Sequence, residues 1–142
     1  MDLTQMTREI EQYVIDLRRE FHAHPELSYH EERTTARIRE ELDRWNIPHE
    51  TVGHGNVVGL LDTGRPGKSL AIRADIDALP MDEPDKSRPY CSQVPGVMHS
   101  CGHDSHAAML LGTARVLSAI RDSLRGKVYF CFQVAEEGGG GA

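Results

Sequence analysis

Apolar residues recur with the spacing of helices in three segments of the chain. In the first segment they fall three or four positions apart, at Met6, Ile10, Val14, Leu17 and Phe21. This period places them on one face and predicts a helix over residues 6–21. A second pattern predicts a helix over residues 29–45 that ends before Pro48. A third apolar stripe predicts a helix over residues 103–120.

Continuous apolar runs predict buried β-strands at residues 56–62, 69–74 and 127–134. The connector 63–68 has the composition of a turn, so we expect the first two strands to form an antiparallel hairpin. The helix over 103–120 joins the second strand to the third, as in a right-handed βαβ unit with parallel strands. The pattern therefore predicts an α/β fold with a mixed, largely parallel sheet flanked by helices.

Charged and histidine residues in the first two helices fit solvent-exposed positions. The second helix carries a charge run made of Glu31, Glu32, Arg33, Arg37, Arg39, Glu40 and Glu41. Opposite charges three or four apart stabilise an exposed helix face, so we expect this face to be solvated. We expect His22, His24 and His30, which lie near a helix end, to be capping or solvent-exposed residues.

Composition excludes several classes of function. The chain has 142 residues and a net charge of −6 without a Lys/Arg cluster, which argues against nucleic-acid binding. No apolar run reaches the roughly 18–20 residues of a membrane span, and the first residues lack a secretory signal. Three cysteines at irregular spacing do not resemble a disulfide framework. We therefore expect a cytoplasmic protein with no nucleic-acid or membrane partner.

A proline-rich segment leads into the densest group of chemically active residues. Residues 78–100 contain prolines that exclude a helix or a central strand, and loops of this length are usually functional. The segment runs into Met98-His99-Ser100-Cys101-Gly102-His103-Asp104-Ser105-His106. Cys101 and His103 are suitable ligands for zinc-like ions and would point the same way in an extended segment. We interpret the cluster as half of a metal site; whether His99 and His106 also face that site is left open.

Acidic residues follow both strands of the predicted βαβ unit. Open α/β sheets bind ligands where their parallel strands end, so these acidic residues and the Cys/His loop should meet at one edge. The candidate metal ligands are Cys101, His103 and Glu137. Glu136 is the candidate general base toward a metal-bound water, and Asp77 is the candidate partner that orients a ligand.

Four segments of the chain form a set of motifs. They are Arg18-Arg19-Glu20-Phe21-His22-Ala23-His24-Pro25-Glu26-Leu27-Ser28, Arg73-Ala74-Asp75-Ile76-Asp77-Ala78-Leu79-Pro80, Gly96-Val97-Met98-His99-Ser100-Cys101-Gly102-His103-Asp104 and Phe132-Gln133-Val134-Ala135-Glu136-Glu137-Gly138-Gly139-Gly140-Gly141-Ala142. Together they resemble the N-terminal part of the aminoacylase/carboxypeptidase family of metal-dependent amidohydrolases. That family includes hippurate hydrolase, N-acyl-L-amino acid amidohydrolase, N-acetyldiaminopimelate deacetylase and the plant indole-acetyl-amino-acid hydrolases.

The resemblance implies a zinc-peptidase-like catalytic domain with two divalent metal ions. Zinc or manganese is expected, with cobalt or nickel as further options. Cys101 matches a ligand that lies between the two ions, His103 and Glu137 match further ligands, and Glu136 matches the general base. The implied reaction hydrolyses the amide bond of an N-acyl amino acid or a related peptide-like substrate, which makes the expected partner a small molecule.

The end of the sequence predicts an incomplete domain. Residues 138–141 are all glycine and follow directly on a strand and two glutamates. The resemblance places further histidine ligands, and a lid or dimerisation domain that would allow a homo-oligomer, beyond Ala142. We therefore expect residues 1–142 to be the N-terminal part of the catalytic domain and to be inactive alone. The alternative is a metal-binding or interaction fragment without hydrolase activity; a structural zinc module fits less well because its ligands normally come in pairs.

Overall fold

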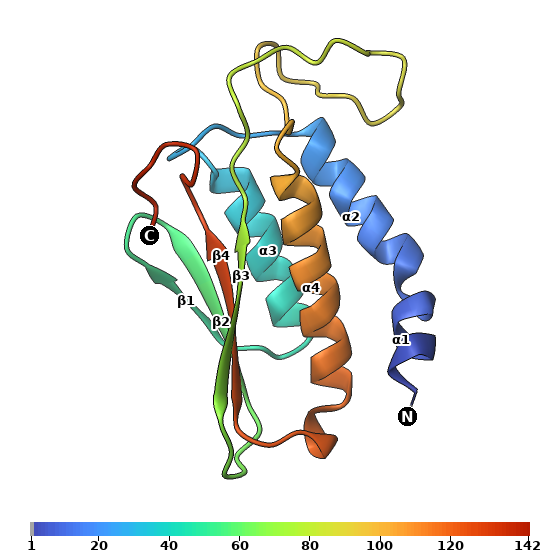
Figure 1. Ribbon diagram of the computed structural model, residues 1–142, viewed down its shortest axis with the longest axis vertical. Coiled ribbons are helices and arrows are strands. Elements are labelled where there is room, and N and C mark those ends of the chain that lie inside the picture. The colour runs from blue at the N-terminus through green and yellow to red at the C-terminus, as the bar shows by residue number, and fades with distance from the viewer. Residues whose placement is uncertain (1) are drawn as a thin grey trace.

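The computed structural model describes residues 2–142, which form one sheet with helices packed beside it (Figure 1). The helices are α1 (Leu3–Glu9), α2 (Glu11–Ala23), α3 (Glu32–Arg44) and α4 (His103–Ala119), and a short 3₁₀ turn, η1, covers Arg121–Ser123. The strands are β1 (His49–Val52), β2 (Asn56–Asp62), β3 (Ser69–Asp75) and β4 (Lys127–Gln133).

The strands form a mixed sheet in the order β1-β2-β4-β3. β3 and β4 are parallel, with Ser69 opposite Lys127 and Asp75 opposite Gln133. β2 is antiparallel to β4, and β1 is antiparallel to β2. The predicted α/β fold, its mixed sheet and the parallel βαβ unit are confirmed. The parallel part is smaller than expected, since it is one of the three pairings in residues 2–142.

The predicted hairpin of residues 56–62 and 69–74 is wrong, because β4 lies between β2 and β3. β4 has an apolar sequence, and its Phe130 and Phe132 are both 0% exposed. A central position buries these rings, and each buried aromatic side chain contributes about 1.5–3 kcal/mol. The free energy gained by burying β4 at the centre of the sheet therefore outweighs the free energy that direct pairing of β2 with β3 would give.

The connector between β2 and β3 wraps around the residue that precedes β4. The Thr63 N–H donates to the Gly126 carbonyl, and the Gly126 N–H donates to the Arg65 carbonyl at 3.0 Å. Gly126 has a φ of +79°, and a Cβ there would lie 2.0 Å from the Lys68 carbonyl oxygen. Only glycine fits this crossing. The connector thus passes the end of β4 to join β2 to β3, and does not close the predicted hairpin.

The helix predictions hold for α3 and α4, with small shifts at their ends. The helix predicted over residues 6–21 is instead two helices, because Ile10 leaves helical geometry with a φ of −102° and a ψ of 3°. The Asp2 side chain caps α1 by accepting the Thr4 N–H at 2.9 Å. The short strand β1 had no counterpart among the predicted elements.

The expected solvated face of α3 is wrong for two of its carboxylates. Glu31, just before the helix, is 4% exposed, and Glu41 is 1% exposed. Glu41 accepts the Tyr13 hydroxyl at 2.7 Å, binds Arg44 at 2.6 Å and forms an ion pair with Arg37. These donors replace the water that the carboxylate loses on burial.

The core lies between the sheet and helices α3 and α4, while α2 packs against α4 (Figure 1). Ile38, Leu42 and Leu111 from the two helices are 0% exposed, as are the two phenylalanines of β4. This packing fixes α4 against β3 and β4. It therefore also fixes the N-terminus of α4 beside the carboxyl ends of these strands.

Residues 76–102 connect β3 to α4 without a helix or strand of their own. Leu79 and Met98 pair at the base of this loop through two hydrogen bonds of 3.0 Å each. Figure 1 shows the loop extending past the ends of the strands. The predicted irregular segment is thus confirmed. None of the helices formed by residues 2–142 has the length and hydropathy required to cross a bilayer.

Candidate metal centre

The residues predicted to form the site meet where β3 and β4 end. β3 ends at Asp75 and is followed by Asp77, whereas β4 leads to Glu136 and Glu137. α4 begins with His103 at the same edge of the sheet (Figure 1). Parallel strands end at the same edge, so the pairing of β3 with β4 accounts for this convergence.

Asp77 holds both the His103 ring and the Glu137 backbone. It is 1% exposed. His103 Nδ1 lies 3.0 Å from Asp77 Oδ1 and 2.9 Å from the Asp77 carbonyl oxygen. A carbonyl oxygen only accepts, so we infer that Nδ1 carries the proton and Nε2 keeps a free lone pair. Asp77 Oδ2 accepts the Ser28 hydroxyl at 2.7 Å and the Glu137 N–H at 2.9 Å.

Cys101, His103 and Glu137 bring three ligand-type atoms together. One such atom from each residue lies within 4.8 Å of the others. The connecting backbone is not the extended segment that was predicted, because Gly102 has a φ of +101° and α4 starts directly after it. This left-handed conformation favours glycine. His103 is buried, whereas Cys101 and Glu137 are exposed, so solvent reaches the group from one side.

Neighbouring carboxylates raise the pKa of the Cys101 thiol. The largest cause is its contact with Glu137, followed by burial and by the charges of Glu136 and Asp75. The negative surroundings therefore disfavour the thiolate as long as no cation is near. A divalent cation reverses this preference, because it stabilises the thiolate directly.

Glu136 faces the same imidazole from outside the three-atom group. Its Oε2 lies 3.8 Å from His103 Nε2, and its side chain is 41% exposed. The preceding residue, Ala135, has a φ of +52°, and its N–H donates to Glu31 Oε1 at 2.7 Å. A left-handed alanine costs about 1–2 kcal/mol, so the buried Glu31 stabilises the turn that directs the two glutamates.

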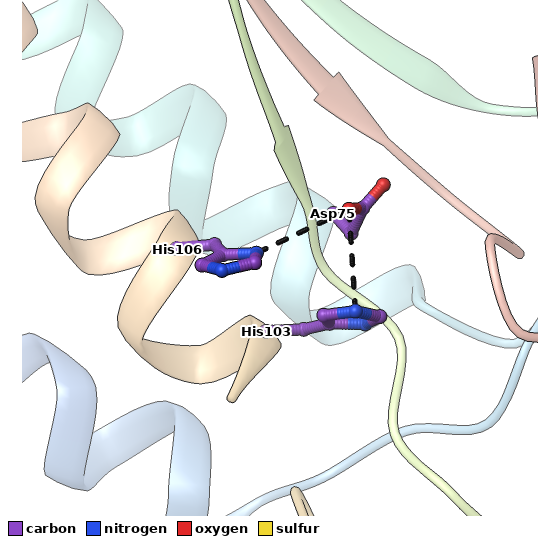
Figure 2. A group of neighbouring side chains, drawn as sticks. All are labelled: Asp75, His103 and His106. Atoms are coloured by element: carbon purple, nitrogen blue, oxygen red, sulfur yellow. Dashed lines mark ion pairs between the residues drawn. The ribbon is translucent and has the colours of Figure 1, made fainter. Parts of the chain in front are cut away.

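Asp75 and His106 form a second group around His103 (Figure 2). Asp75 Oδ2 lies 4.0 Å from His103 Nε2 and 4.0 Å from His106 Nδ1. The two histidines are three residues apart in the first turn of α4, a spacing that places both on one face of the helix. The sequence placed Asp75 at this edge without a role and left His106 open; the His-x-x-His spacing was the available signal.

His22 is not the exposed or capping residue that the sequence suggested. It is 1% exposed, and its ring nitrogens lie 2.7 Å from Asp104 Oδ2 and 3.2 Å from Glu83 Oε1. Arg18 Nε lies 2.9 Å from the same Asp104 oxygen. Glu83 belongs to the long loop and Asp104 to α4. His22 therefore links the loop of residues 76–102 to α4, the helix on which His103 lies.

Three further polar residues lie near the site: Ser28, for which the sequence predicts no role, Glu31, which it predicts to be solvated, and His99, whose position relative to the site it leaves open. Ser28 binds Asp77 and Glu31 binds the Ala135 N–H, across 49 and 104 residues of sequence. His99 is 4% exposed, and neither ring nitrogen has a hydrogen-bond partner among residues 2–142. Burial lowers the pKa of His99 to about 4, so its ring is neutral near pH 7. A single sequence carries no signal for contacts between such distant positions.

The donor set fits a divalent metal ion. An imidazole nitrogen with a free lone pair, a thiol and a carboxylate are ligands of zinc-like ions. Asp75 adds a carboxylate whose Oδ1 is buried. This oxygen forms an ion pair with Arg73 Nη2 at 2.5 Å, but their orientation does not make a hydrogen bond. Cys101, His103 and Glu137 form one of the two groups whose atoms could hold an ion.

The sequence is similar to those of peptidases and amidohydrolases. The sequence profile of peptidase family M20/M25/M40 matches residues 71–142. The chain is 44% identical over 137 residues to an N-acyl-L-amino acid amidohydrolase from Geobacillus stearothermophilus. That alignment covers 96% of this chain and 37% of the relative.

Two solved structures share the fold. One, described as an aminohydrolase from methicillin-resistant Staphylococcus aureus, has a TM-score of 0.91 and 45% identity over 95% of this chain and 36% of that chain. The other is the Bacillus subtilis YXEP protein, described as a dinuclear metal binding peptidase. It has a TM-score of 0.85 and 42% identity over 92% of this chain and 36% of that chain. The chain thus spans little more than a third of the length of each of these three proteins.

Proposed function

Because the chain belongs to peptidase family M20/M25/M40, we propose that residues 1–142 are the N-terminal part of the catalytic domain of a metal-dependent amidohydrolase. The family resemblance predicted from the four motifs is confirmed by the profile match. The proposed reaction is hydrolysis of an amide bond in an N-acyl amino acid or a related peptide-like substrate. Similarity to a relative named for N-acyl-L-amino acids supports this substrate class.

The proposal depends on one observation. His103 Nε2, with its free lone pair, lies near a thiol and carboxylates at the open edge of the sheet. Cys101 and Glu137 offer ligand atoms within 4.8 Å, and the Glu136 carboxylate lies 3.8 Å away. A catalytic metal site needs a few protein ligands, an open position and a nearby base. The group has these features.

Each of these residues has its own role in the proposed reaction. Cys101, His103 and Glu137 would hold the ion, which would act as a Lewis acid toward the amide carbonyl and a water molecule. Glu136 accepts a proton from the attacking water and donates it to the amine nitrogen as the C–N bond breaks. The products are a carboxylic acid and a free amine. Asp77 keeps His103 in the tautomer whose Nε2 is free.

The proposal includes two divalent ions, zinc or manganese with cobalt or nickel as further options. The description of the Bacillus subtilis relative as dinuclear supports the number of ions. The remaining ligands, and a lid or dimerisation domain able to form a homo-oligomer, would belong to polypeptide beyond residues 1–142. The coverage of 37% of the relative's length supports this division. Three free cysteines, Cys91, Cys101 and Cys131, support a cytoplasmic setting, and a small-molecule substrate is the proposed partner.

The test uses the complete polypeptide that contains this chain, with an N-acetyl amino acid as substrate. Glu136→Gln should retain bound metal and lower kcat by about 10²–10⁴-fold, because it removes the base and leaves the ligands. The neighbouring change Glu137→Gln is the matched control and should lose metal from the Cys101–His103–Glu137 position together with rate. Cys101→Ser should also lose metal from this position. Full metal content and rate in Cys101→Ser, or exchanged behaviour of the two glutamate variants, would refute the assigned roles.

The alternative function is metal binding without hydrolysis by residues 1–142 alone. The short coverage of the relatives favours it for the chain by itself. The purified 142-residue chain should then bind a divalent ion and show no amide hydrolysis that a chelator abolishes. Chelator-sensitive hydrolysis by this chain would instead show that its residues suffice for the reaction.

A further inference from the structure

His103 Nε2 faces two sets of ligand atoms, but its lone pair binds one ion at a time. One set is Cys101 and Glu137, and the other is Asp75 and His106 (Figure 2). Nδ1 is bonded to Asp77, so Nε2 is the ring nitrogen available to an ion. The Asp75–His106 set has no role in the proposed hydrolysis.

The second set has the composition of a metal site. Asp75, His103 and His106 supply one carboxylate and two imidazoles, a combination found in zinc enzymes and in non-haem iron enzymes. Bonds of about 2.0–2.2 Å to a tetrahedral ion place the ligand atoms about 3.4 Å apart. Asp75 Oδ2 lies 4.0 Å from each of the two ring nitrogens. Small rotations of the Asp75 carboxylate and of the exposed His106 side chain close these two differences.

Exposure decreases along the set from His106 to His103. The exposed fractions of the side chains are 47% for His106, 11% for Asp75 and 3% for His103. A cavity of about 290 Å³, lined in part by Ile72, Asp75, His106 and Met109, adjoins the group. An ion can therefore reach the three atoms from solvent, and the cavity has room for the waters that complete its coordination.

Asp75 is oriented to act as a ligand. Its Oδ1 forms the ion pair with Arg73 on one side, and its Oδ2 faces the two histidines on the other. Glu136 Oε2 also lies 3.8 Å from His103 Nε2 and adds negative charge on this side of the ring. Arg73 partly offsets that charge, but its side chain is 52% exposed and its effect is screened by solvent.

The geometry points to a second divalent-ion position, formed by Asp75, His103 and His106, that an ion occupies in place of the Cys101–His103–Glu137 position. The two positions exclude each other because both require His103 Nε2. The second lacks a sulfur ligand, so its preference shifts from thiophilic ions toward those that favour nitrogen and oxygen. It shares His103 with the proposed catalytic site but does not depend on amide hydrolysis.

The experiment titrates the metal-free 142-residue chain with Co²⁺, because a thiolate ligand gives Co²⁺ a strong near-ultraviolet absorption band. The unaltered chain should bind one equivalent and show this band. Cys101→Ser should still bind one equivalent but without the band. Adding His106→Gln or Asp75→Asn to Cys101→Ser should weaken binding at least about 10–100-fold, since a direct ligand contributes no less than an outer-shell partner.

The control in the Cys101→Ser background is His30→Gln. His30 is exposed, and loss of its imidazole should leave Co²⁺ affinity unchanged. Far-ultraviolet circular dichroism of each variant shows whether it is folded. Absence of Co²⁺ binding by folded Cys101→Ser, or an unchanged affinity when His106→Gln is added, overturns the proposal. Binding of two equivalents by the unaltered chain overturns the mutual exclusion.

Two further measurements leave Asp75, His103 and His106 unchanged. Arg73→Gln in the Cys101→Ser background should tighten Co²⁺ binding by up to about fivefold, a gain that misfolding does not produce. With Zn²⁺ bound to Cys101→Ser, the ¹⁵N shifts of His103 Nε2 and His106 Nδ1 should both change; an unchanged His106 shift contradicts the proposal. Failure of these tests leaves the hydrolysis test with Glu136→Gln unaffected, so the two proposals fail separately.

Discussion

Glu41 and Asp77 are buried to the same degree, each 1% exposed, but the charges around them differ. Glu41 lies against two guanidinium groups, those of Arg37 and Arg44, and also accepts the Tyr13 hydroxyl. Its charge is therefore balanced within the fold. Through these partners Glu41 fixes α3 against α2. Its negative charge is already neutralised, so a bound cation has no charge to neutralise there.

Asp77 has hydrogen-bond donors but no lysine or arginine partner among residues 2–142. Its donors are the His103 ring, the Ser28 hydroxyl and the Glu137 N–H. The nearest further charges around that ring belong to acidic side chains, including Asp75 and Glu136. Negative charge gathered around a buried carboxylate and imidazole is costly unless a cation binds there.

The difference separates a structural carboxylate from one that belongs to a site. Both are satisfied in hydrogen bonds, so hydrogen bonding alone does not distinguish them. The sign of the surrounding charge does, because a bound divalent cation stabilises one cluster and has no role in the other. Variants of the two clusters, compared with and without metal, therefore test the distinction.

The largest expected effect is that of Glu41→Ala on stability. Removal of this buried carboxylate takes the acceptor from the Tyr13 hydroxyl and one of the acidic partners from Arg37, and should cost about 3 kcal/mol of unfolding free energy. Urea unfolding measures the loss, and Glu40→Ala on the exposed face is the control, expected within about 0.5 kcal/mol of the unaltered chain. Added Zn²⁺ should stabilise Glu41→Ala and the unaltered chain equally. A loss below about 1 kcal/mol, or a different response to Zn²⁺, contradicts the structural role.

Asp77→Ala should act mainly on metal binding. Without this carboxylate the His103 ring and the Glu137 backbone lose the partner that holds them, so Zn²⁺ affinity should fall about 10–100-fold. This corresponds to about 1.4–2.8 kcal/mol. Competition with a chromophoric chelator measures it. Asp77→Asn keeps an acceptor for His103 Nδ1 and should lose less; an equal fall of Zn²⁺ affinity in Glu41→Ala would remove the distinction between the clusters.

The hydrophobic pattern predicted most elements but not the order of the strands. The strand predicted over residues 56–62 has the same bounds as β2, because the apolar run that indicates a buried strand is a local feature of the sequence. Strand order depends on competition between strands. β4 takes the central position with the buried Phe130 and Phe132, and nothing in residues 56–74 shows that it will separate β2 from β3.

Predictions about single polar residues succeeded or failed according to where their partners lie. Cys101 and His103 are neighbours in sequence, and Glu137 follows the strand paired with β3, so their approach follows from local spacing and topology. The sequence predicts Glu41 to be exposed and His22 to be exposed or capping, because a charge or a histidine near a helix surface is usually solvated. Their partners, up to 82 residues away, are decided by tertiary packing that no periodicity shows.

The smallest expected effect tests a third buried carboxylate, Glu83, which binds His22 and the Ser92 N–H. Burial opposes its ionisation, but these two hydrogen bonds outweigh burial and lower the pKa of Glu83. A lowered pKa means that the stabilisation is present above the unfolded value of about 4.3 and is lost as pH falls through the folded value. Glu83→Gln should therefore cost about 1 kcal/mol at pH 7, and the difference from the unaltered chain should shrink below about pH 4. Urea unfolding at both pH values, with and without Zn²⁺, measures this difference in stability. A difference independent of pH contradicts the ionised pair. A difference that Zn²⁺ abolishes would show that Glu83 belongs to the metal cluster, like Asp77, and is not a purely structural carboxylate like Glu41.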